Sequence, residues 1–149
     1  MRNLVILIGL WGCVPPEEDN GCLVASDLTE FQPVCSQALL GLYDEQTILE
    51  LPGGSGAVLT AYLEASPSIQ AYGGETGNSL SMILEVHSES WSAVGRNSTL
   101  TVASLEEDIA ELRIDAHFAD GLNVDGFSIQ GPFEATVVTS LNEDTASND

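Results

Sequence analysis

Residues 110–118 read Ala-Glu-Leu-Arg-Ile-Asp-Ala-His-Phe, and this stretch decides the fold class. Apolar side chains occupy every second position, and the positions between them hold Glu111, Arg113, Asp115 and His117. Successive side chains of a β-strand point to opposite faces. The period of two therefore predicts a strand with one buried face and one face in contact with solvent.

The same alternation recurs before this stretch, at residues 57–65, 80–87 and 98–104. Residues 105–108, Leu-Glu-Glu-Asp, supply a turn between the last of these strands and residues 110–118, which indicates an antiparallel hairpin. Further short strands are expected at residues 47–51, 68–72, 122–129 and 133–137, with a bulge or turn near Gly126. About seven short strands with little or no helix predict an all-β domain, either an antiparallel sandwich or a partly open barrel.

The chain begins with a basic residue, Arg2, and an apolar run over residues 4–10, and it becomes polar soon after Cys13. This order is typical of a secretory signal. Twelve helical residues would rise about 18 Å, whereas a hydrocarbon core is about 30 Å thick. We therefore expect residues 1–12 to be a signal peptide that is removed, and not a membrane-spanning helix.

Residues 10–13, Leu-Trp-Gly-Cys, resemble the lipobox of bacterial lipoproteins. The resemblance implies transfer of a diacylglyceryl group to Cys13, cleavage after Gly12 and acylation of the new amino terminus by a fatty acid such as palmitate. It also implies a lipid anchor in the bacterial cell envelope, and we expect the outer membrane. Two alternatives remain: an ordinary secretory signal cut nearby, or an apolar first strand.

Three cysteines are an odd number for an exported chain. If Cys13 carries lipid, Cys22 and Cys35 remain as a pair, and an oxidising compartment favours a disulfide between them. The alternative is two buried, unpaired thiols. The resulting division is a tether with this disulfide over residues 13–36, a β domain over residues 37–139, and an acidic, disordered tail over residues 140–149.

The segments around Leu100-Thr101-Val102, residues 114–118 and residues 131–135 are similar to the C-terminal hairpins of uncharacterised lipoproteins of the myxobacterial type. The similarity covers about 45 residues. It implies an all-β exported domain and assigns no activity or catalytic residues.

The charge is strongly negative, because 23 acidic residues face three arginines and there is no lysine. Such a surface repels phosphate backbones, so a nucleic-acid partner is not expected. Acidic residues on outward strand positions are ordinarily a solvated surface that needs no ligand.

Candidate chemistry is sparse. Asp120, Asn123 and Asp125 could supply oxygen ligands to calcium, but an EF-hand register would place Gly121 and Pro132 at its first and last ligand positions, so that motif fails. His87 and His117 fall on outward positions of their strands and are expected to face solvent. We predict no catalytic residues, no metal site and no cofactor, and hence no enzyme.

The expected function is therefore structural or interactive: a membrane-anchored, envelope-exposed acidic domain. Its partners would be the lipid bilayer, through acylated Cys13, and an envelope protein or glycan that contacts an aromatic patch of Tyr62, Tyr72 and Trp91. The alternative is an exported module that binds calcium or a small ligand with the loops around residues 120–126.

Overall fold

A computed structural model describes residues 22–139 except residues 44, 65, 121 and 122. The described part is all-β, as the alternating pattern predicts, but it contains ten strands and not seven. Its strands are β1 (Ala25–Ser26), β2 (Leu39–Leu42), β3 (Thr47–Pro52), β4 (Val58–Leu63), β5 (Ala71–Gly73), β6 (Ser81–Val86), β7 (Glu89–Ser92), β8 (Thr99–Leu105), β9 (Ile109–Asp120) and β10 (Asn123–Thr139).

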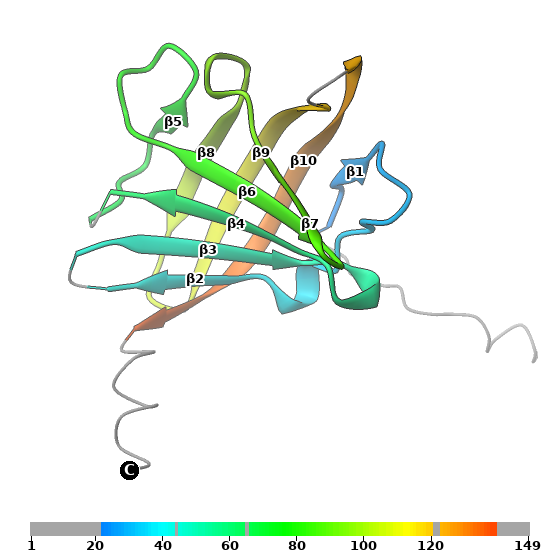
Figure 1. Ribbon diagram of the computed structural model, residues 1–149. Coiled ribbons are helices and arrows are strands. Elements are labelled where there is room, and N and C mark those ends of the chain that lie inside the picture. Colours follow the sequence, from blue (N-terminus) through cyan, green and yellow to red (C-terminus); the bar gives the residue numbers. More distant parts are fainter. Residues whose placement is uncertain (1–21, 44, 65, 121–122, 140–149) are drawn as a thin grey trace, which may run out of the picture.

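The strands form one curled, open sheet, a half-barrel, in the order β5-β8-β9-β10-β2-β3-β4-β6-β7, with β1 added to β10. In Figure 1, β2, β3, β4, β6 and β7 lie in front of β8, β9 and β10 and cross them at a steep angle. Ala93, directly after β7, forms an isolated bridge with Phe118 of β9. This bridge places the edge of the sheet at β7 next to β9, which lies inside the strand order.

The core lies between these two layers and is built by the alternating residues. The inward set of β9 is Ala110, Leu112, Ile114, Ala116 and Phe118, each at most 2% exposed. Leu59, Ala61 and Leu63 of β4 and Met82, Leu84 and Val86 of β6 are buried in the same way. Burying one such large apolar side chain stabilises the fold by about 1.5–3 kcal/mol, so the period of two also specifies which face turns inward.

The folded domain begins earlier than the boundary predicted at residue 37. Phe31 is completely buried and Cys35 is 5% exposed, and both belong to the hydrophobic core. The Phe31 ring packs directly over the backbone of Gly53, where a Cβ would collide with it. Residues from Cys22 onward are therefore part of the domain and not of a tether.

One strand pairing departs from the antiparallel expectation. β10 pairs with β2 in parallel, from Thr136 opposite Leu39 to Thr139 opposite Leu42. The two strands lie far apart in the sequence, so no hairpin turn fixes their relative direction. All other strand pairs in the described sheet are antiparallel.

Residues 123–139 form the single strand β10, although the sequence suggests two. The predicted irregularity is present, because the register with β9 shifts between Asn123 and Phe127. Pro132 does not end the strand. Its carbonyl accepts a hydrogen bond from the Leu23 N–H at 3.2 Å, so its missing N–H faces the N-terminal segment and costs no bond to β9.

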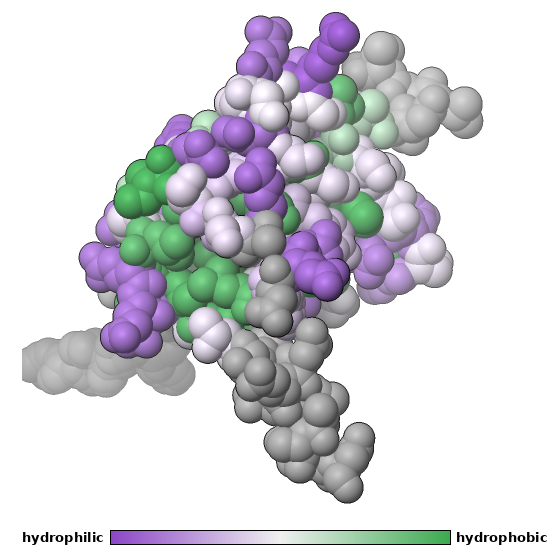
Figure 2. Space-filling view, turned by 90° about the vertical axis from the view of Figure 1, so that its left-hand side faces the viewer, coloured by the Kyte–Doolittle hydropathy of each residue, from purple (hydrophilic) through white to green (hydrophobic). Residues whose placement is uncertain are grey.

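Three short 3-10 turns complete the described domain: η1 (Cys35–Gln37), η2 (Gly54–Gly56) and η3 (Gly95–Asn97). No helix in the described ranges has the length and apolar character needed to cross a membrane. On the face shown in Figure 2, a large apolar area at the left and smaller ones elsewhere lie among mostly hydrophilic side chains.

Candidate functional site

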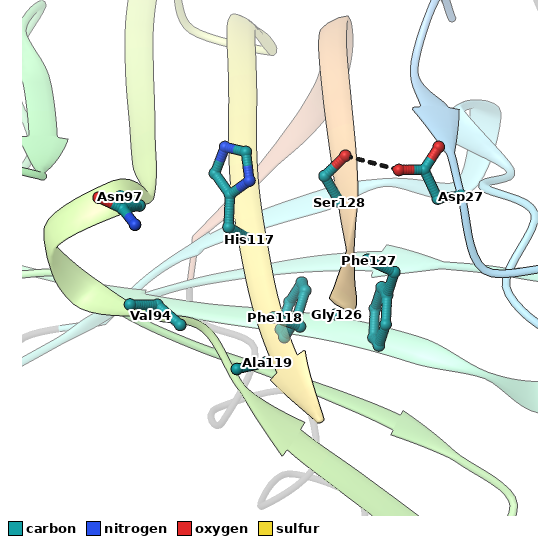
Figure 3. Close-up of a pocket in the computed structure, with 9 residues that line it drawn as sticks. All are labelled: Asp27, Val94, Asn97, His117, Phe118, Ala119, Gly126, Phe127 and Ser128. Atoms are coloured by element: carbon teal, nitrogen blue, oxygen red, sulfur yellow. Dashed lines mark hydrogen bonds between the residues drawn. The ribbon is translucent and has the colours of Figure 1, made fainter. Parts of the chain in front are cut away.

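An open hollow lies where β9 and β10 meet η3 and the segment after β1 (Figure 3). Its volume is about 320 Å³. The lining residues come from four separate parts of the chain and are Asp27, Val94, Asn97, His117, Phe118, Ala119, Gly126, Phe127 and Ser128.

The register of β9 and β10 sets the geometry of this hollow, because His117 stands opposite Ser128 and Phe118 opposite Phe127. The His117 N–H donates to Ser98 Oγ at 2.9 Å, and the His117 carbonyl accepts from the Val94 N–H at 2.7 Å. Both backbone groups thus point away from β10. Side chains of such a non-hydrogen-bonded pair lie closer together than those of a bonded pair, so His117 and Ser128 are close neighbours.

Asp27 is held against β10 by two hydrogen bonds. Its N–H donates to the Ser128 carbonyl at 3.0 Å, and its Oδ2 accepts from Ser128 Oγ at 2.9 Å. Figure 3 shows the carboxylate beside Ser128, at one end of a row of polar side chains that continues to His117 and Asn97. A carboxylate on a short, exposed segment is in this way given a fixed position.

The imidazole of His117 is oriented by its own strand. His117 Nε2 lies 2.9 Å from Asp115 Oδ1, and the same oxygen accepts from Gln130 Nε2 at 2.9 Å. The side chains of His117 and Asp115 are 40% and 47% exposed, so this pair contributes little to stability. The contact instead fixes the orientation of the imidazole ring, with Nε2 facing Asp115.

Phe118 and Phe127 are among the lining residues, but their side chains point to the opposite face of the sheet from His117 and Ser128. Phe127 stacks on Phe118 with ring centroids 5.0 Å apart, and Trp91 meets Phe127 edge-on at 5.6 Å. Phe118 is buried, whereas Phe127 and Trp91 are half-buried. Trp91 contacts Phe127 but does not itself line the hollow.

Serine, histidine and aspartate are neighbours here, and the serine hydroxyl is hydrogen-bonded to the aspartate. Ser128 Oγ donates to Asp27 and not to His117. A nucleophilic serine needs a hydrogen bond to the base that removes its proton. The observed arrangement places the hydrogen-bonding side chains of Asp27, Ser128 and His117 together at one hollow.

The structure joins Cys22 and Cys35 by a disulfide, with their Cα atoms 5.3 Å apart, as the cysteine count predicts. Cys13 lies outside the described residues, and so do the side chains of Asp120, Asn123 and Asp125. Across the described residues, no group of three or more His, Cys, Asp or Glu side chains is placed to hold a metal ion.

His87 is exposed in the turn between β6 and β7, and His117 is partly exposed, so both face solvent as predicted. The predicted aromatic patch is wrong in one member. Tyr72 is completely buried, and its hydroxyl accepts a hydrogen bond from the Ser68 N–H at 2.8 Å. Because β5 pairs with β8, Tyr72 turns into the core opposite Leu100.

Asp27 and Ser128 are two lining residues that the sequence did not single out as part of a site. Ser128 follows the register shift between β9 and β10. Counting residues from the turn near Gly126 would therefore not have shown that Ser128 lies opposite His117. Asp27 meets β10 through a pairing of only two residues, Ala25 with Gln130 and Ser26 with Ile129. A contact between residues about a hundred positions apart carries no local signal.

No protein-family model matches the chain, and no curated protein or solved structure is significantly similar to it. The site must therefore be interpreted from its own chemistry.

Proposed function

We propose that this chain is an envelope-exposed bacterial lipoprotein, anchored by lipid on Cys13, whose β domain binds a ligand or partner at the hollow between β9, β10 and η3. The observation that carries the anchoring part is the cysteine pairing. Since Cys22 and Cys35 form a disulfide, Cys13 is the one cysteine of the three left outside it. It also follows an apolar run and a small residue, which is the arrangement that a lipoprotein signal requires.

The short separation in sequence between Cys13 and the folded domain supports the same proposal. Only residues 14–21 separate Cys13 from Cys22, and they include two prolines and three acidic residues. Proline-rich chain is extended and semi-rigid, so such a segment acts as a short spacer between a lipid surface and the domain.

The binding part of the proposal rests on the hollow. Asp27 and His117 are held by neighbours, and the exposed Val94 lines the hollow with them. Fixed polar groups beside an apolar surface provide orientation and contact area for a ligand with little ordering cost.

The test is fractionation of bacteria that express the chain. The wild-type protein is expected in the detergent-soluble membrane fraction, and Cys13→Ser is expected in the soluble fraction or retained as uncleaved precursor. Cys22→Ser is the matched control, because it removes a thiol without removing the acceptor of the lipid. Equal membrane association of Cys13→Ser and the wild type would refute lipid anchoring at this residue.

A further inference from the structure

The groups that line the hollow are mostly acceptors of hydrogen bonds. Asp27 uses Oδ2 for the bond from Ser128, and within the described part of the chain its second carboxylate oxygen has no hydrogen-bond partner. His117 places Nε2 at Asp115, so the proton of a neutral imidazole is on Nε2 and Nδ1 carries a lone pair. In Figure 3 the imidazole stands between Asn97 and Ser128, on the polar side of the hollow.

No described residue that lines the hollow is an arginine, and the chain has no lysine. Arg96 precedes Asn97 on η3, but it is exposed and does not line the hollow. Asp27 is therefore a carboxylate with no arginine or lysine among the described lining residues. The 23 acidic residues of the chain add a negative potential that raises the local concentration of cations.

The apolar residues that line the hollow favour an organic cation over a metal ion. Val94, Phe118 and Phe127 border the hollow, and a volume of about 320 Å³ is large enough for a side-chain-sized group. A metal ion would gain nothing from these apolar neighbours, since hard cations require several oxygen ligands. An organic cation with an aliphatic or planar body gains contact with both polar and apolar lining residues.

We propose that the hollow binds an organic cation, a guanidinium or primary ammonium group, with Asp27 as its counter-ion and the exposed Val94 as an apolar neighbour. This inference rests on the proposed binding role of the hollow and names its ligand class. A guanidinium suits the site well, because it is a planar donor that bonds carboxylates through two N–H groups. The cation can belong to a free amine or to a basic side chain of a peptide.

Trp91 provides the readout. The chain has two tryptophans, Trp11 and Trp91, so the full chain with Trp11→Phe carries Trp91 alone. Trp91 contacts Phe127, which lines the hollow. Titration with argininamide is expected to change Trp91 fluorescence in a saturable manner, whereas citrullinamide, a neutral analogue of similar shape, is expected to bind at least about fivefold more weakly.

The variant Asp27→Asn is expected to weaken argininamide binding by at least about fivefold. Glu134→Gln is the matched control, because it removes the same charge from an exposed position of β10 that is six residues, or about 20 Å, from Ser128. Ser128→Ala keeps the carboxylate but removes the hydroxyl that orients it, and an intermediate loss is expected. This second variant keeps the proposal testable if Asp27→Asn disturbs the attachment of β1.

A tripeptide containing one arginine, with both ends blocked, separates the two sources of the cation. Tighter binding of the tripeptide than of argininamide indicates a peptide ligand, and the reverse indicates a free amine, so either result supports the proposal. Equal affinities for argininamide and citrullinamide, or equal effects of Asp27→Asn and Glu134→Gln, would overturn it. Saturable binding of a neutral sugar with no binding of argininamide would also overturn it, while leaving the proposed binding role of the hollow intact.

Discussion

At the scale of single residues, Gly131 shows how a backbone contact fixes a side-chain position far along the chain. Its φ is +141°, and a Cβ at this position would collide with the backbone of Leu23 and Val24. The absence of a side chain lets the N-terminal segment run close beside β10 and carry Asp27 to Ser128. Any other residue at position 131 would adopt a strained backbone and push this segment away.

We therefore predict that Gly131→Ala lowers the free energy of unfolding by about 1–3 kcal/mol, as measured by urea denaturation. Gly54→Ala is the control, because a Cβ added there would meet no atom within 4 Å and its φ is not positive. The control is expected to change stability by less than about 0.5 kcal/mol. If the two substitutions have equal effects, the close approach of the Leu23–Val24 backbone to Gly131 does not contribute to stability.

At the scale of elements, the N-terminal segment is attached by few contacts. β1 pairs with β10 through two residues only, and Leu23 is 72% exposed. The Cys22–Cys35 disulfide ties the start of this segment to η1, and Cys35 lies in the core. The disulfide therefore attaches Cys22, and with it the segment that ends in Asp27, to the hydrophobic core.

Replacement of Cys22 and Cys35 by serine is expected to lower the free energy of unfolding by about 3 kcal/mol, through loss of a constraint on the unfolded chain. Amide hydrogen exchange of residues 23–27 is expected to accelerate more than that of the core strand β9, because the segment opens without unfolding the domain. Uniform acceleration across the two regions would show that the bridge stabilises the whole fold and does not anchor this segment.

The elements also show what could be predicted from the sequence. β4, β6 and β9 follow from period-two alternation, because each has one face in the core and one in solvent. The residues of β2, Leu-Leu-Gly-Leu at 39–42, do not alternate in polarity, and the exposed β7 has no apolar stripe, so neither was predicted. The hollow was not predicted either, because it depends on the two-residue pairing of β1 with β10 and on the register shift in β10, which leave no periodic signal.

At the scale of the whole molecule, the main feature is the large negative net charge. The formal net charge of −20 implies repulsion among acidic side chains that the folded state concentrates into a small volume. Salt screens this repulsion, since the Debye length falls from about 30 Å at 0.01 M to about 3 Å at 1 M ionic strength.

The melting temperature is therefore expected to rise between about 10 mM and about 500 mM sodium chloride, and each kcal/mol gained would correspond to roughly 4–8 °C. Caesium chloride is the control, because it screens equally but offers a much larger cation that does not fit a sodium site. Equal stabilisation by the two salts is predicted. A rise with sodium alone would indicate bound metal ions in place of general screening.

The central claim at this scale is that Cys13 joins the domain to a membrane. The most direct test is the intact mass of the protein extracted from bacterial membranes with detergent. We predict a chain that begins at Cys13, carries a diacylglyceryl group on its sulfur and a fatty acid on its amino group, and retains the Cys22–Cys35 disulfide. A chain that begins at Met1 or Arg2 and carries no lipid would contradict the account.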